Sequence, residues 1–181
     1  RVTRDGRMHW DSGRVMSAQS VHVPYAGPDL ESTGRYSWRV QVWDGAGRKS
    51  AWSAPASWEM GLLTLEDWTA RWIRPSVESD PNVPQPSPML RRTFRMKGAV
   101  RRARAWVTSL GLYELEINGR RVGNQVFTPG WTSYGKRLQY QTFDVTGHLR
   151  RGENAVGATL GDGWYRGYLH LPGHDRRNTY G

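Results

Sequence analysis

The sequence contains no cysteine, which excludes disulfide bonds and metal sites built on thiolates. It also contains no apolar run of about 18 residues, the length that a transmembrane helix needs. No signal peptide is visible, but Arg1 is not a natural start, so this absence carries no information about targeting. The cellular location therefore stays open.

What the sequence does contain is enough apolar side-chain surface for packed cores. Of 181 residues, 37% are hydrophobic and 12% aromatic, with ten tryptophans, which argues against a disordered chain. The 21 glycines and 10 prolines are scattered at turn positions and favour short β-strands. This length holds one sandwich of ordinary size and part of another, because domains commonly have about 100–150 residues.

The net charge of +10 is carried almost wholly by arginine. Two interpretations are open: attraction to nucleic acid or an acidic polysaccharide, or an arginine bias spread over solvated surfaces. The longest basic run, 91–104, is interrupted by apolar side chains, and Phe94 is its one aromatic residue. This pattern favours strands with polar outer faces. We expect no nucleic-acid partner and no membrane partner.

The strongest local pattern is a predicted β-hairpin in the middle of the chain. Segment 113–117, YELEI, alternates apolar and acidic residues with the period of a half-buried strand. Asn118 and Gly119 follow at once and supply the two positive-φ positions of a type I′ turn. The chain is therefore expected to reverse into a second strand at 120–122.

A second break follows this hairpin at 128–130, Thr-Pro-Gly, where proline removes a backbone donor and glycine permits a tight turn. Segment 138–145 then alternates again. We expect one antiparallel β unit with an aromatic loop, 131–134, between its strands.

The first part of the chain has the pattern of a small sandwich. Segment 21–23 is expected to be a short strand, and 35–43, RYSWRVQVW, is the clearest strand. Beyond it, Thr64 is expected to cap a short helix, with Asp67 reaching back as its capping-box partner. We place the domains at 1–61 and 75–181, with a connector at 62–74.

The remaining segments of the second domain are strands and turns. The proline-rich stretch 75–88 is expected to be an exposed loop, and 89–96 and 103–109 are expected to be strands. A small-residue strand is expected at 155–160. The turn at 161–163 would deliver Trp164, Tyr165 and Arg166 to a loop.

Three strings carry a resemblance to a known family: GLYELEINGRRVG, FTPGWTSYGKRLQYQTFDVT and GENAVGATLGDGWYRG. They resemble the N-terminal β-domain of bacterial α-L-rhamnosidases, glycoside hydrolase family 78, from about residue 72 to the end. The string YSWRVQVWDGAGRKSAWSAP resembles the late strands of a fibronectin type III domain. The fold class is therefore expected to be all-β: a partial fibronectin type III-like sandwich whose first strand is missing, followed by an incomplete jelly-roll β-sandwich that is cut at its C-terminal end.

The resemblance also implies a function. Such enzymes hydrolyse terminal α-L-rhamnosyl linkages with inversion, using glutamates of an (α/α)6 helical barrel that follows the β-domains. None of the barrel's motifs is present, so we expect no catalytic residue in this chain, and we expect the isolated chain to be inactive. The implied partners are a rhamnose-containing glycoside or polysaccharide and the catalytic barrel of the same polypeptide. The alternative is a stand-alone carbohydrate-binding module.

Two patterns that could carry chemistry of their own are weak. Glu114 and Glu116 share one strand face about 6.5–7 Å apart, within the range of an inverting carboxylate pair. Glutamates on a strand face outside an acidic cleft are usually solvated charges. His170 and His174 have the spacing of zinc ligands on a helix, but the proline and glycine between them forbid that helix.

Sugar binding is the function that the loops themselves favour. Sugars present flat apolar faces, so their sites combine aromatic rings with amides and carboxylates on a rigid scaffold. Two loops have this composition, and the alternative is that their rings plug the end of the sandwich or dock on the barrel. The candidates are Asn124, Gln125, Trp131 and Tyr134 in one loop, and Asp162, Trp164, Tyr165 and Arg166 in the other.

The resemblance leaves room for calcium, although no cofactor is required. In some family members this β-domain binds rhamnose with calcium through an Asp-Asn dipeptide after a similar hairpin. The comparable place here is Asn124-Gln125, which has no carboxylate. Calcium takes 6–8 oxygen ligands and favours carboxylates, which weakens the case. Asp162 would contribute one ligand from the other loop.

Overall fold

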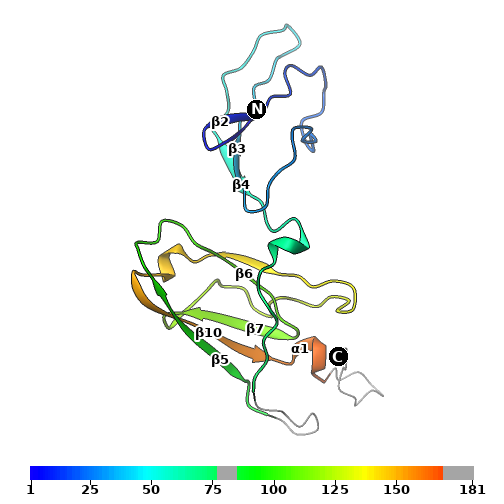
Figure 1. Ribbon diagram of the computed structural model, residues 1–181. Helices are drawn as coiled ribbons and strands as arrows, with labels where there is room; N and C mark the ends of the chain where they lie inside the picture. Colours follow the sequence, from blue (N-terminus) through cyan, green and yellow to red (C-terminus); the bar gives the residue numbers. More distant parts are fainter. Residues whose placement is uncertain (77–84, 169–181) are drawn as a thin grey trace, which may run out of the picture. The chain divides into compact units, whose positions relative to one another are not determined.

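The computed structural model describes residues 1–76 and 85–168. The contacts divide the chain into two compact units, unit 1 from Arg1 to Trp72 and unit 2 from Ile73 to Gly181 (Figure 1). Strands form most of the regular structure in both units. No helix in the described ranges is both long and apolar enough to cross a membrane.

Unit 1 contains one four-stranded antiparallel sheet in the order β2-β1-β3-β4. Its strands are β1 (Val2–Arg4), β2 (Arg7–Trp10), β3 (Arg35–Trp38) and β4 (Ala56–Glu59). The 3-10 turn η1 (Leu65–Asp67) follows the sheet.

The expected strand pattern in this unit was wrong in three places. The β1–β2 hairpin was not predicted, although Asp5 and Gly6 carry the two positive φ angles, 49° and 76°, of its tight turn. Segment 21–23 forms no strand, and its middle residue, His22, has a positive φ of 54°, which lies outside the extended region. The strand expected over 35–43 ends at Trp38. Beyond it the pairing is irregular, with one bridge from Trp43 to Lys49 and backbone hydrogen bonds that the Val42 and Val40 carbonyls accept from segment 50–53.

Tyr36 is the centre of unit 1. Its side chain is 1% exposed, and its ring stacks on the Trp58 ring with centroids 5.3 Å apart. Its hydroxyl oxygen accepts a hydrogen bond from the Glu31 backbone N–H at 2.9 Å. The ring therefore joins the sheet to the segment that precedes β3.

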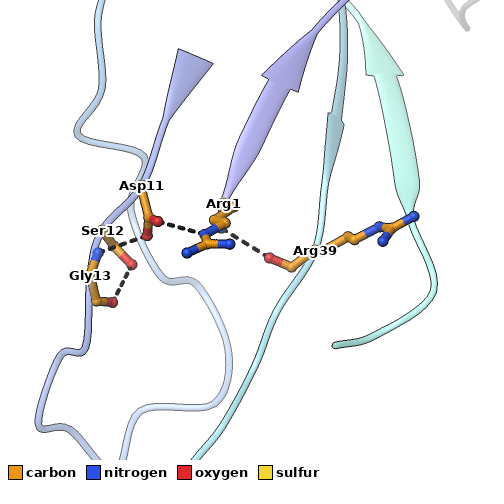
Figure 2. A network of polar contacts seen from close by, with 5 residues as sticks. All are labelled: Arg1, Asp11, Ser12, Gly13 and Arg39. Carbon is orange, nitrogen blue, oxygen red and sulfur yellow. Dashed lines mark hydrogen bonds and ion pairs between the residues drawn. The ribbon is translucent and has the colours of Figure 1, made fainter. Parts of the chain in front are cut away.

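A polar network fastens the chain after β2 to the start of β1 (Figure 2). The Arg1 guanidinium donates to the Asp11 carboxylate at 2.6 Å, and the Gly13 N–H donates to the same carboxylate at 2.9 Å. The hydrogen bond from Arg1 is the main cause that lowers the pKa of Asp11. The network is exposed, so it orders the chain and contributes little stability.

The predicted cap at Thr64 is confirmed. The Thr64 backbone N–H donates to the Asp67 carboxylate at 3.0 Å, which closes η1 from its N-terminal side. The Ser32 hydroxyl donates to the same carboxylate and is the main cause that lowers the pKa of Asp67. One carboxylate therefore holds the turn and the loop before β3 together.

The described residues of unit 2 form two sheets. The larger has the order β5-β10-β7-β8, with β5 (Met89–Met96), β10 (Gly152–Gly161), β7 (Leu112–Ile117) and β8 (Arg120–Arg121). The smaller pairs β6 (Arg104–Val107) with β9 (Gln141–Asp144). A short 3-10 turn, η2 (Thr146–His148), leads from β9 toward β10.

The predicted hairpin is confirmed, but the pairing expected beyond it is not. Asn118 and Gly119 have φ angles of 54° and 73°, and they connect β7 to β8 as the sequence indicated. Strand β9 pairs with β6 and belongs to the other sheet. The aromatic loop at 131–134 therefore lies on a connection between sheets, and not inside one antiparallel unit.

The core of unit 2 lies between its two sheets. Tyr113, Leu115 and Ile117 of β7 are buried, and they pack in one cluster with Phe143 of β9 and Val145. The glutamates that alternate with them are exposed. Period-2 alternation has thus produced an apolar inner face and a charged outer face. Two sheets around one such cluster make unit 2 a β-sandwich.

Candidate functional site

The first candidates to place are the two glutamates of β7, Glu114 and Glu116. Both side chains lie on the exposed face of the sheet. The Glu114 carboxylate accepts from the Arg121 guanidinium at 3.1 Å across the β7–β8 ladder. This arrangement matches solvated strand-face charges.

Two loops that are far apart in sequence meet through aromatic rings. The Trp131 and Trp164 rings are stacked almost in parallel, with centroids 6.1 Å apart and an interplanar angle of 4°. Phe127 approaches the Trp164 ring edge-on at 5.9 Å. Phe127 is 65% exposed and Trp131 is 52% exposed. Phe127, Trp131 and Trp164 are called the aromatic surface below.

A second ring contact joins the same two loops. Tyr134 and Tyr165 meet edge-on with centroids 5.2 Å apart. The segment after Gly163 was expected to be a loop but is a short helix, α1 (Gly163–Arg166). One turn of helix places Trp164 and Tyr165 at successive positions, so each ring reaches a different partner in the other loop.

Hydrogen bonds to the core hold the loop that carries Phe127 and Trp131. Thr128 donates its hydroxyl to the Tyr113 carbonyl at 2.7 Å, and the Tyr113 N–H donates to the Thr128 carbonyl at 2.9 Å. The Gln141 side-chain amide donates to the Pro129 carbonyl at 3.1 Å. The peptide bond between Thr128 and Pro129 is cis. The aromatic surface therefore stands on backbone that is tied to β7 and β9.

Tyr113 links these anchors. Its hydroxyl donates to the Gln141 side-chain oxygen at 2.8 Å, and burial raises its pKa to about 12. Phe127 has a φ of 58°, a left-handed conformation that is unusual for a bulky residue. The Phe127 backbone has this conformation although the Phe127 ring is largely exposed.

The remaining candidates are Asn124 and Gln125 in one loop and Asp162 and Arg166 in the other. Asn124 and Gln125 are exposed, and neither side chain hydrogen-bonds to any residue that the structure describes. The Gln125 carbonyl accepts from Arg121 at 2.9 Å. Asp162 accepts from the Arg166 guanidinium at 3.0 Å.

Comparison with known proteins gives two matches that together span most of the chain. Residues 98–181 match the family model described as the α-L-rhamnosidase N-terminal domain. Residues 1–64 match the model of the Rha78A-like N-terminal immunoglobulin domain. The chain belongs to the α-L-rhamnosidase family, glycoside hydrolase family 78. It matches the N-terminal region of these proteins. Unit 1 is accordingly immunoglobulin-like.

Individual α-L-rhamnosidases are similar to this chain in sequence or structure over nearly its whole length. An α-L-rhamnosidase of Formosa agariphila is 36% identical over 166 residues, which cover 88% of this chain and 18% of that protein. The crystal structure of the Aspergillus terreus enzyme matches with a TM-score of 0.84 and 37% identity, covering 99% of this chain and 21% of that one. The Streptomyces avermitilis enzyme in complex with L-rhamnose matches with a TM-score of 0.85 and 25% identity, covering 98% and 34%.

The chain therefore spans about a fifth of the length of the first of these rhamnosidases. The matched region is the N-terminal, non-catalytic part of these proteins.

The residues near the expected calcium position of this rhamnosidase region do not make a good ion site. Within the described ranges, no group of three or more His, Cys, Asp or Glu could hold a metal ion. The carboxylate of Asp162 already pairs with Arg166, so a bound cation would compete with a guanidinium. Asn124 supplies no carboxylate. His170 and His174 lie outside the described residues. Calcium stays a prediction that this geometry disfavours.

Sequence reasoning missed Phe127 as a member of the aromatic surface. The signal was an apolar pair, Val126-Phe127, directly before the Thr-Pro-Gly break. A large ring beside a turn that cannot join a strand is a candidate for exposure. It also missed Asn154, which is 1% exposed and is the most buried polar residue among those described in unit 2.

Proposed function

We propose that this chain serves as the N-terminal, non-catalytic region of an α-L-rhamnosidase. The observation that carries the proposal is that both units match the N-terminal region of such enzymes, while the chain spans only a small share of their length. The whole protein would hydrolyse terminal α-L-rhamnosyl linkages with inversion. Unit 1 would be the fibronectin type III-like module, and unit 2 would be a jelly roll.

A matched pair of polypeptides tests this proposal. The complete polypeptide that the gene encodes should release rhamnose from an aryl α-L-rhamnoside, and NMR should detect the β-anomer first because inversion forms it. The same polypeptide with the catalytic carboxylates of its downstream domain replaced by amides should release none. Release of the α-anomer first, or full activity in the amide variant, would contradict the proposed reaction.

We further propose that the aromatic surface of unit 2 receives a sugar ring. Its support is geometric: Trp131 and Phe127 are exposed, and both rings contact Trp164, a partly buried ring of the other loop. Rings held on rigid backbone lose little conformational freedom when a ligand stacks on them. The alternative role is a seat for a following domain, which would use the same rings.

Replacing Trp131 by alanine separates these roles. We expect rhamnose affinity to fall about tenfold or more, because truncation removes the more exposed of the two stacked tryptophan rings. The unfolding free energy should fall by only about 1 kcal/mol, because the ring is half-exposed and loses one stacking contact. Calorimetric titration of rhamnose with and without calcium measures the affinity. Trp72→Ala, a change of an exposed tryptophan in unit 1, is the control.

The titration has two informative outcomes. Heat in the parent chain that disappears in Trp131→Ala and persists in Trp72→Ala supports the sugar surface. No heat from the parent chain under either calcium condition rejects the sugar surface and favours the docking role. Neither outcome bears on the reaction proposed for the whole protein, which is tested separately above.

A further inference from the structure

The turn between β7 and β8 is an Asn-Gly dipeptide, Asn118 followed by Gly119. A backbone nitrogen that belongs to glycine is unhindered because no Cβ flanks it. A Cβ built at Gly119 would meet no atom within 4 Å, so the turn faces open space. We propose that Asn118 is a site of spontaneous deamidation, that the fold restrains this reaction, and that the reaction loosens the turn when it occurs.

The chemistry needs only water. The Gly119 backbone nitrogen attacks the Asn118 side-chain carbonyl carbon, and a new C–N bond closes a five-membered succinimide. The bond from that carbon to Nδ2 breaks, and ammonia leaves with the proton that the Gly119 nitrogen gives up. Water then adds to one of the two ring carbonyls. The products are aspartate, or isoaspartate in which the chain runs through the side chain.

Three hydrogen bonds hold the Asn118 amide away from this reaction. Its Nδ2 donates to the His148 carbonyl at 2.8 Å and to the Asn154 side-chain oxygen at 2.9 Å. Its side-chain oxygen accepts from the Ala155 backbone N–H at 2.9 Å. The leaving nitrogen and the carbonyl are both engaged. The amide must give up these contacts before the Gly119 nitrogen can reach it.

Asn154 strengthens this restraint because both ends of its own side-chain amide are hydrogen-bonded. Its side-chain oxygen also accepts from the Arg150 N–H at 3.0 Å. Its amide nitrogen donates to the Arg150 carbonyl at 2.8 Å and the Gly152 carbonyl at 3.0 Å. At 1% exposure, it has no water to replace these partners. Reaction at Asn118 therefore requires local opening of the turn, segment 148–152 and β10 together.

The product cannot rebuild the network. An ionised aspartate has no donor, yet it would face two acceptors, the His148 carbonyl and the Asn154 side-chain oxygen. Turning the Asn154 amide over would only move the conflict, since its oxygen would then face the Arg150 and Gly152 carbonyls. After deamidation, the open form of the turn is therefore favoured over the closed form. The closed network that asparagine made does not form again.

The first experiment compares native and unfolded chain at mildly alkaline pH. Peptide mapping by mass spectrometry follows deamidation of Asn118, with Asn124 as the internal reference because it is exposed and followed by glutamine. We expect Asn118 to react at least about tenfold more slowly in buffer than in concentrated urea, because only the open form reacts. Asn124 should change little. Equal rates for Asn118 in both conditions would overturn the proposal.

Two matched variants test the restraint and the consequence. Asn154→Ala should speed native-state deamidation of Asn118 roughly tenfold, whereas Asn124→Ala should leave it unchanged. Asn118→Asp should lower the urea midpoint of unit 2 clearly more than Asn124→Asp. An unchanged rate in Asn154→Ala, or equal midpoints for the two aspartate variants, would overturn the proposal. If Asn154→Ala fails to fold, the native-versus-urea comparison decides alone.

Discussion

Asn154→Ala is expected to lower the unfolding free energy of unit 2 by about 3 kcal/mol, because a buried donor or acceptor left without a partner costs about 1–3 kcal/mol. The variant strips partners from the Asn118 amide, from the Arg150 N–H and carbonyl, and from the Gly152 carbonyl. Alanine also leaves a void in a region that excludes water.

Hydrogen exchange resolved by peptide measures this loss in unit 2 by itself, which matters because two units need not unfold together. Protection of β7 and β10 should fall in Asn154→Ala and stay unchanged in Asn124→Ala, whose side chain is exposed. A loss below about 1 kcal/mol in β10 would show that the network is not a main restraint.

Tyr36→Ala is expected to cost unit 1 about 3–5 kcal/mol, the usual range for removing a buried aromatic ring. Tyr36 is 1% exposed and stacks on Trp58, and Val2 is the other buried hydrophobic residue among those described in this unit. A unit with so few fully buried side chains depends heavily on each one.

Urea unfolding followed by tryptophan fluorescence reports this change, since most of the tryptophans belong to unit 1. Leu65→Ala is the matched control, because Leu65 is an apolar residue of the same unit with 83% exposure. Tyr36→Phe should show a smaller loss, from the hydrogen bond to Glu31 alone. Equal midpoints for Tyr36→Ala and Leu65→Ala would contradict a core centred on Tyr36.

Local patterns in the sequence predicted the local structure well. The alternation from Tyr113 to Ile117 marked the buried face of β7, and Asn118-Gly119 marked the turn after it. Thr64 and Asp67 were correctly paired as a cap. Each of these features depends on residues within a few positions of one another in the sequence. A short stretch of sequence is therefore enough to predict it.

Pairing between distant segments could not be predicted in this way. Strands β6 and β9 lie more than 30 residues apart, and no local pattern in either segment names its partner. Segment 21–23 is a local pattern that failed, because its two valines flank His22, whose positive φ of 54° interrupts an extended strand. The β1–β2 hairpin was predictable from Asp5-Gly6, and that signal was overlooked.

In the candidate site too, the local features were predictable and the contacts between distant segments were not. The composition of the two loops pointed to Trp131 and Trp164, but no spacing indicated that their rings would stack. Asn154 carries no sequence signal, because its role depends on partners supplied by the hairpin turn and segment 148–152. Polar residues of this kind are found only when burial is known.

This chain is expected to hold β units and no catalyst, and the most direct measurement of this expectation is rhamnose release by the purified chain. The folded state is first verified by slow hydrogen exchange in β7 and β10. An aryl α-L-rhamnoside should then be hydrolysed no faster by the chain than by buffer. Turnover that exceeds the buffer rate, and that Glu114→Gln or Glu116→Gln abolishes, would contradict the account.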